Sequence, residues 1–132
     1  MAYAERFEEL QAWQVARKLA AGVYAFTSQD QVARDTRFCS QIRAAAVSVM
    51  SNIAEGFESQ SRSMFIKHLY LAKGSAAEVR NQLYVALDQK YVTLEQFNEL
   101  YQDAITASRL IAGLSLIHIS EPTRLLSISY AV

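Results

Sequence analysis

The chain has 132 residues, the length of one domain, and 52% of them are hydrophobic, which is enough to bury a core. Four glycines and one proline disfavour turn-rich β folds, and a single cysteine excludes an internal disulfide. Thirteen basic residues balance thirteen acidic ones, so the net charge is zero. The net charge therefore does not show the excess of basic residues that is typical of nucleic-acid-binding proteins.

Apolar residues recur at helical spacing over residues 7–26, which predicts a first helix, and residues 27–31 form a polar break. A second helix is predicted over residues 36–55, with Asp35 or Thr36 as its N-cap and Gly56 as its C-terminal cap. Its core stripe consists of Phe38, Ile42, Ala45, Val49 and Ile53.

A third helix is predicted over residues 63–89. Gly74 lies inside it, where glycine costs about 1 kcal/mol relative to alanine, so we expect close approach of another helix as compensation. A fourth helix begins at Thr93, because Thr93 and Gln96 fit a capping box, and its period continues to residue 111. The third helix has a heptad seam made of Phe65, Leu69, Ala72, Ala76, Val79, Leu83 and Ala86.

Short connections between long helices make sequence neighbours antiparallel. The sequence therefore predicts an all-α fold, an antiparallel up-down-up-down four-helix bundle over residues 1–113. Residues 114–132 differ from the rest of the chain in composition and pattern, because they hold the only proline and show no amphipathic helical period.

This last segment resembles a translated sequencing adapter. A transposase adapter encodes Leu114 to Arg124 codon for codon, and flow-cell adapter sequence encodes Ile128 to Val132 after a gap that fits a sample index. We therefore interpret residues 114–132 as a non-native tail, exclude it from functional reasoning, and expect it to lack consistent packing.

The second helix carries the most informative surface. Little charge lies between Arg43 and Glu55, and a helix that is apolar nearly all round is buried on more than one side. It should face either a helix of the same chain or another subunit, and both alternatives stay open at this point. We expect one set of four helices to cover it incompletely, which favours association. The predicted oligomer-interface residues are Gln41, Ala45, Ser48, Asn52 and Glu55.

At this stretch the sequence resembles a known family. Residues Gln41–Ser48, followed by Asn52–Phe57, are similar to the signature of the four-helix-bundle proteins encoded in intervening sequences of bacterial 23S rRNA genes. Leu10–Gln14 resembles the first-helix opening of that family, and Phe65–Ser75 with Glu78 resembles its third helix. The resemblance covers residues 7–113.

The resemblance implies a four-helix bundle that assembles as a ring, typically a pentamer. The family is similar to the accessory variability determinant of diversity-generating retroelements, a basic pentameric barrel that binds a reverse transcriptase and nucleic acid. Most family members have no assigned activity and no accepted catalytic residues. RNA and a reverse transcriptase are therefore candidate partners.

Two features weaken a nucleic-acid role, because phosphate neutralisation drives such binding. Ala44 stands where the family often has a second basic residue, and the net charge is zero. Local basic patches remain candidates, although a solvated mixed-charge face is the simpler interpretation of each. The candidate nucleic-acid-binding residues are Arg34, Arg37, Arg43, Arg62, Lys67 and Lys73.

No catalytic constellation emerges from the sequence. Cys39 lies near a predicted helix start, where a thiol pKa can fall, but only His68 could serve as its base before residue 114. An inert thiol is therefore favoured. Glu55 and Glu78 could face each other, but a di-metal carboxylate bundle needs Glu-x-x-His pairs, and none occurs. We expect no cofactor, no metal and no small-molecule substrate.

The leading hypothesis is a non-enzymatic homo-oligomeric module, a scaffold or adaptor for a protein or RNA partner. The alternative is a nucleic-acid-binding accessory protein of a reverse transcriptase. A small hydrolase or metal enzyme is a third hypothesis, which no constellation supports. We expect a cytoplasmic protein with no membrane partner, because no apolar run approaches the roughly 20 residues that cross a bilayer and the N-terminus lacks a signal-peptide pattern.

Overall fold

The computed structural model describes residues 4–120, and the side chains of residues 4–117. Its elements are a short 3-10 helix η1 (Phe7–Glu9) and the helices α1 (Gln11–Thr27), α2 (Asp30–Ala33), α3 (Thr36–Glu58), α4 (Arg62–Asp88) and α5 (Leu94–Ser120). No strand occurs among these residues, so the all-α prediction is confirmed. None of the helices in this part of the chain is long and apolar enough to cross a membrane.

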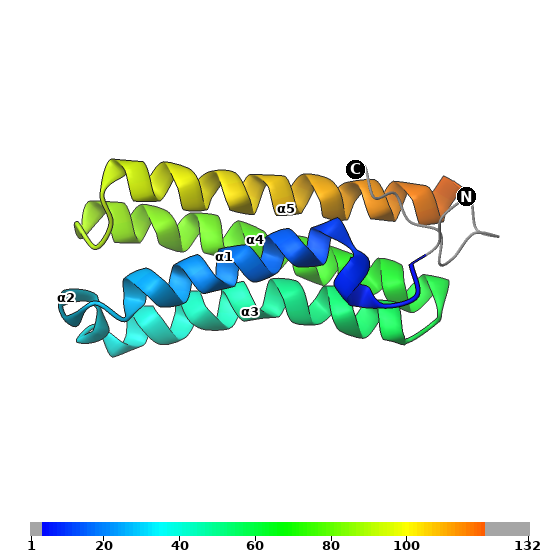
Figure 1. The fold of residues 1–132 in the computed structure, drawn as a ribbon, viewed down its shortest axis with the longest axis horizontal. Helices are drawn as coiled ribbons and strands as arrows, with labels where there is room; N and C mark the ends of the chain where they lie inside the picture. The colour runs from blue at the N-terminus through cyan, green and yellow to red at the C-terminus, as the bar shows by residue number, and fades with distance from the viewer. Residues whose placement is uncertain (1–3, 121–132) are drawn as a thin grey trace.

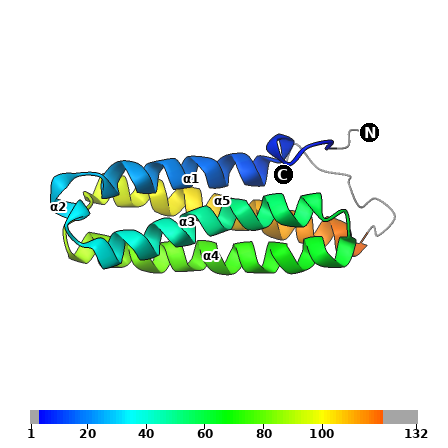
Figure 2. The ribbon, with the colours of Figure 1, turned by 90° about the horizontal axis from the view of Figure 1, so that it is seen from below.

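The long helices α1, α3, α4 and α5 lie side by side, and the chain reverses direction between one and the next (Figure 1). Helix α3 packs on α1 and α4, and helix α5 also packs on α1 and α4. The view from below shows α3 and α4 adjacent along their whole length (Figure 2). Two buried clusters fill the interior, and the half-buried Met50 packs against both.

The polar break after the first long helix contains a helical turn that the sequence pattern did not predict. Four residues are too few to show a helical period, so α2 has no sequence signature of its own. Its Val32 side chain is 1% exposed and belongs to the core cluster at this end of the molecule. The segment therefore closes the core instead of looping through solvent.

The start of α3 agrees with one of the two predicted caps, and its end differs from the prediction. The carboxylate of Asp35 accepts a hydrogen bond from the Phe38 backbone N–H at 3.2 Å, as an N-cap does. Gly56 does not cap the helix, which continues to Glu58, and the left-handed turn falls on Gln60 (φ 55°). Gly56 is buried where α3 packs on α4. The two helices are so close there that an added Cβ would lie 2.7 Å from the Cβ of His68.

The heptad seam of α4 is buried at all seven predicted positions, from Phe65 to Ala86. Ser61 caps the helix by accepting a hydrogen bond from the Met64 N–H at 3.3 Å. The expected compensation at Gly74 is wrong, because no atom lies within 4 Å of a Cβ built there. This glycine is exposed on the outer surface of α4, and no other helix of the described residues approaches it.

Helix α5 opens with the predicted capping box: Gln96 accepts from the Thr93 N–H at 2.8 Å, and Thr93 accepts from the Gln96 N–H at 3.1 Å. The helix then runs past residue 113, contrary to the expected break in packing. Leu114 is 4% exposed, because it continues the buried spacing of Leu110 and Ile111. Residues 121–132 of the predicted tail lie outside the described residues.

One contact joins two connections at the α2 end. The Tyr91 hydroxyl, in the α4–α5 connection, donates to the Asp35 carboxylate at 2.6 Å. This hydrogen bond is the largest cause that lowers the pKa of Asp35, and it raises the pKa of Tyr91. Asp35 therefore caps α3 and holds the α4–α5 connection with the same side chain.

Glycine-to-alanine exchanges at positions 56 and 74 form a matched pair. Both add the same methyl group inside a helix, which favours the helix by about 1 kcal/mol. Gly56→Ala also forces α3 against His68, and such overpacking costs about 1–3 kcal/mol. Urea unfolding at high dilution should place Gly56→Ala below Gly74→Ala by that amount. Equal stabilities would show that the α3–α4 contact at Gly56 is not tight.

Tyr91→Phe tests the contact with Asp35 through its pH dependence. A carboxyl with a lowered pKa stabilises the fold above its unfolded-state pKa, about 3.9, and loses that contribution as the pH falls through the folded-state value. We expect a lower Tm than the parent at pH 7 and convergence of the two Tm values as the pH falls from 5 to 2. Tyr70→Phe, on an exposed tyrosine, is the control, and a constant Tm difference across this range would contradict the account.

Candidate functional site

Three of the predicted interface residues of α3 bond to α4 of the same chain. Three side-chain hydrogen bonds cross between these helices, and we call them the polar seam. They join Gln41 to Gln82 at 3.2 Å, Ser48 to Ser75 at 2.8 Å, and Asn52 to His68 at 2.9 Å.

The middle of the polar seam is a connected network. Ser75 donates to the Ser48 hydroxyl oxygen, and the Asn52 amide donates to the same oxygen at 3.0 Å and to the Ser48 carbonyl at 2.9 Å. The Asn52 carbonyl oxygen is then left to accept from the Nδ1–H of His68. Every member has a partner, as half-buried polar groups require.

This network changes the argument for an assembly. Ala45 is 4% exposed, and Ser48 and Asn52 are half-buried, without a second subunit. One chain therefore covers these three positions of the second long helix, which we expected a set of four helices to cover incompletely. Glu55 is exposed beyond the end of the seam. An oligomer interface at Gln41, Ala45, Ser48, Asn52 and Glu55 stays a prediction, but their burial no longer argues for it.

The basic candidates do not form one patch. Arg43 has a structural role, because its Nε donates to the Thr27 hydroxyl at 2.8 Å and its guanidinium lies 4.6 Å from the centre of the Tyr24 ring. Arg34 and Arg37 are exposed at the α2 end. The exposed residues Arg62, Lys67 and Lys73 occupy the first half of α4, which begins at the opposite end of the molecule (Figure 1).

Cys39 is buried, and its thiol is bonded to backbone carbonyls. Its thiol donates to the Val32 carbonyl at 3.3 Å, and burial raises the pKa of the thiol despite the opposing charge of Arg43. His68, the only histidine with a described side chain, belongs to the polar seam. Among the described residues, no cluster of histidine, cysteine, aspartate or glutamate could hold a metal ion. This environment is that of an inert thiol.

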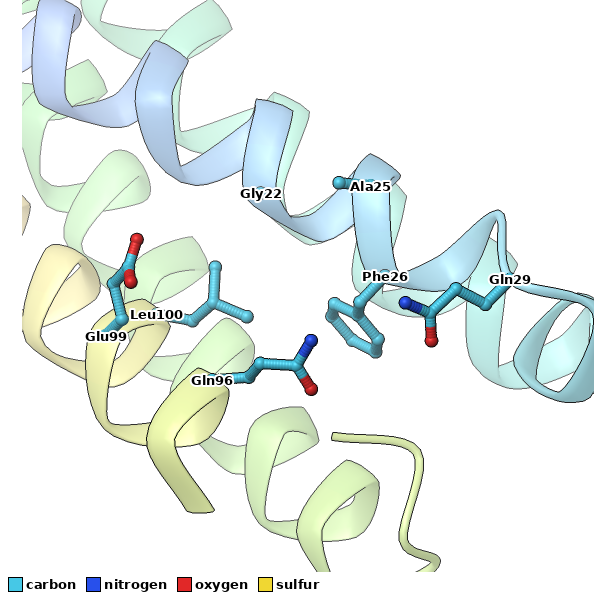
Figure 3. A pocket seen from close by; sticks show the side chains of 7 residues that line it. All are labelled: Gly22, Ala25, Phe26, Gln29, Gln96, Glu99 and Leu100. Atoms are coloured by element: carbon cyan, nitrogen blue, oxygen red, sulfur yellow. The ribbon is translucent and has the colours of Figure 1, made fainter. Parts of the chain in front are cut away.

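A small hollow lies where the end of α1 meets the start of α5 (Figure 3). Its volume is about 170 Å³, and Gly22, Phe26, Gln96 and Leu100 are among its lining residues. Ligand pockets usually enclose about 300–1,000 Å³. Gln96 is also held by its capping box. At Gly22, beside the hollow, the two helices pack closely, because an added Cβ would lie 2.5 Å from the Leu100 side chain.

The feature that the sequence pattern did not single out is the outer surface of α4. Large apolar side chains usually lie on the buried stripe, yet several on this helix are 39–62% exposed. Their positions fall between those of the heptad seam, which is the signal that could have identified them. They are Met64, Tyr70, Leu71, Tyr84 and Val85.

A double-mutant cycle on Asn52 and His68 tests the polar seam. Asn52→Ala should destabilise the protein by about 1–3 kcal/mol, because it leaves the His68 Nδ1–H without a partner and removes one of the two donors to the Ser48 hydroxyl. The double variant with Asn52→Ala and His68→Ala should lose less stability than the two single variants lose in sum. The free energies of unfolding in urea measure this coupling. The control Gln41→Ala, at an exposed end of the seam, should change stability by less than about 0.5 kcal/mol. Strict additivity would contradict the network.

Comparison with known proteins agrees with this architecture. No curated protein matches the chain. A crystal structure of a protein of unknown function from the S23 ribosomal protein family of Bacteroides thetaiotaomicron is similar in fold, with a TM-score of 0.72 and 24% sequence identity over 79% of this chain and 97% of that one. The model of the 23S rRNA-intervening sequence protein family matches residues 8–113. The chain therefore belongs to the 23S rRNA-intervening sequence protein family.

Proposed function

We propose that this protein is an antiparallel up-down-up-down four-helix bundle that acts without catalysis, as a homo-oligomeric scaffold or adaptor for a protein or RNA partner. The observation that carries the proposal is the outer side of α4, where the exposed Met64 (39%), Leu71 (49%) and Val85 (40%) recur at multiples of seven residues. Apolar side chains that gather on a protein surface mark interaction sites. A helix with a complete buried seam does not need them for its own folding.

The surroundings of the reactive side chains also favour a binding role. Acid–base and nucleophilic catalysis need a base within hydrogen-bond reach of the group it activates. Cys39 donates to backbone carbonyls, and His68 is held by Asn52. These arrangements stabilise the fold and leave neither group poised for chemistry in the part of the chain described.

A nucleic-acid-binding accessory role is the second candidate, and the exposed Arg34 and Arg37 at the α2 end favour it. The exposed acidic residue Asp30 lines the same surface hollow as Arg34. Because affinity for nucleic acid scales with the number of phosphates neutralised, two arginines beside a carboxylate supply little binding. We therefore rank this role below protein association.

Sedimentation velocity of the full chain at micromolar concentration tests the leading function. We expect a species larger than the 14.8 kDa chain, and five copies if the ring implied by the family resemblance forms. A titration with a single-stranded RNA at low and at physiological salt should show no tight complex. A strict monomer would contradict the oligomeric scaffold, and salt-sensitive RNA binding by that monomer would favour the accessory role instead.

A further inference from the structure

Another hollow lies at the α2 end of the molecule, where α1 ends and α3 begins. Its volume is about 220 Å³. Thr36, Ser40 and Arg43 follow one another at steps of four and three residues, which places them on one side of α3. We call this space the Arg43 hollow, and it is lined by Thr27, Ala33, Thr36, Cys39, Ser40 and Arg43.

The guanidinium of Arg43 is held in place by residues of α1 and of the turn that follows it. Its Nε donates to the Thr27 hydroxyl at 2.8 Å, and one terminal nitrogen lies 3.4 Å from the Ser28 hydroxyl. The ring of Tyr24 packs against it, with 4.6 Å to the ring centre. These partners are all neutral, and no carboxylate among the described residues forms an ion pair with Arg43. The hollow therefore holds a fixed positive charge that is not neutralised by the chain.

Two hydroxyls of the Arg43 hollow have no partner within the described part of the chain. Thr36 and Ser40 are exposed, and neither side chain makes a hydrogen bond there. Thr27 differs, because it is fully buried and its hydroxyl donates to the Val23 carbonyl while it accepts from Arg43. Thr27 thus positions the guanidinium, and Thr36 and Ser40 remain as donors for a ligand.

This set of donors matches a phosphate group. A guanidinium presents several N–H donors in a planar fork that fits the oxygens of a phosphate, and hydrogen bonds to a charged oxygen are the strong ones. The hydroxyls of Thr36 and Ser40 can donate to further oxygens of the same group. The volume is below the range of about 300–1,000 Å³ that is usual for drug-sized ligands, but a phosphate group is much smaller than such a ligand.

The surrounding charges favour one small anion over a nucleic-acid strand. Residues 30–43 contain three arginines and two aspartates, an excess of one positive charge. The carboxylate of Asp35 already accepts from the Tyr91 hydroxyl and the Phe38 N–H, and Asp30 lines a neighbouring hollow with Arg34. Affinity for RNA grows with the number of phosphates neutralised, whereas the Arg43 hollow has room and donors for one.

We propose that the Arg43 hollow binds the phosphate group of a small phosphate monoester, with Arg43 as the charged ligand and Thr36 and Ser40 as hydroxyl donors. All three residues come from one helix of one chain, so the site is independent of the proposed oligomeric function. The Cys39 thiol, which also lines the hollow, donates to backbone carbonyls, so the phosphate is bound and not transferred.

A titration of the isotope-labelled full chain with inorganic phosphate, followed by NMR, tests the proposal. We expect saturable shifts of the backbone amide signals of Thr36 and Ser40 and of the Arg43 Nε–H signal. Adenosine monophosphate should shift the same signals, and adenosine, which lacks the phosphate, should not.

Variants of the full chain separate the hollow from general electrostatic attraction. Ala33→Glu places a carboxylate in the Arg43 hollow, so phosphate affinity should fall at least about tenfold. The control Ala77→Glu makes the same exchange at an exposed position of α4, which does not pack on α2, and should leave the affinity unchanged. Ser40→Ala should weaken binding about tenfold by removing one donor to the anion, with no change in Tm.

Three results would overturn the proposal. If no signal shifts saturably at millimolar phosphate, the hollow binds no phosphate. If Ala33→Glu and Ala77→Glu weaken binding equally, the charge of the whole chain attracts the anion and the hollow does not. If a single-stranded RNA without a terminal phosphate shifts the same signals at lower concentration than adenosine monophosphate, and steeply loses affinity with salt, the hollow belongs to a nucleic-acid surface instead.

Discussion

The contact between α3 and α4 is the constraint on which the rest of the structure depends. The two helices approach so closely at Gly56 that a methyl group there would meet the Cβ of His68. At this distance polar side chains cannot keep water around them, so Ser48, Asn52, His68 and Ser75 must satisfy one another. Ser48 and Asn52, which fit an intersubunit surface in the sequence, thus bond to α4 within one chain. The outer surfaces of the same two helices remain available for a partner.

Much of the fold follows from local sequence patterns. The buried seam of α4, the Asp35 cap and the Thr93–Gln96 capping box depend on spacing and on cap chemistry, which act over a few residues. Helix α2 could not be predicted, because a single turn has no period. The continuation of α5 beyond residue 113 could not be predicted either, because these residues show no helical period of their own. Leu114 is buried because its position in the helix continues the buried stripe of the preceding residues.

The candidate site was harder to predict, because periodicity identifies a buried face without naming what buries it. Gln41, Ser48 and Asn52 fit an intersubunit contact and an intrachain contact equally well in the sequence, and only the position of Ser75 and His68 across from them reveals the intrachain bonds. The two helical glycines show the same limit. The sequence predicts a helix end at Gly56 and close approach of a helix at Gly74, yet Gly56 lies under a neighbouring helix and Gly74 faces open space. Pairing of distant residues is information that the local pattern does not hold.

The central claim is that one chain satisfies the polar seam internally, and we propose that the exposed apolar side chains of α4 are the ones that a second copy covers. Hydroxyl-radical footprinting of the unmodified chain over a concentration series tests it most directly. Met64 and Leu71 are exposed in the single chain, as is Tyr24 on α1. The account predicts that oxidation of Met64 and Leu71 falls as concentration rises, whereas oxidation of Tyr24 stays constant. Undiminished oxidation of Met64 and Leu71 at every concentration would contradict it.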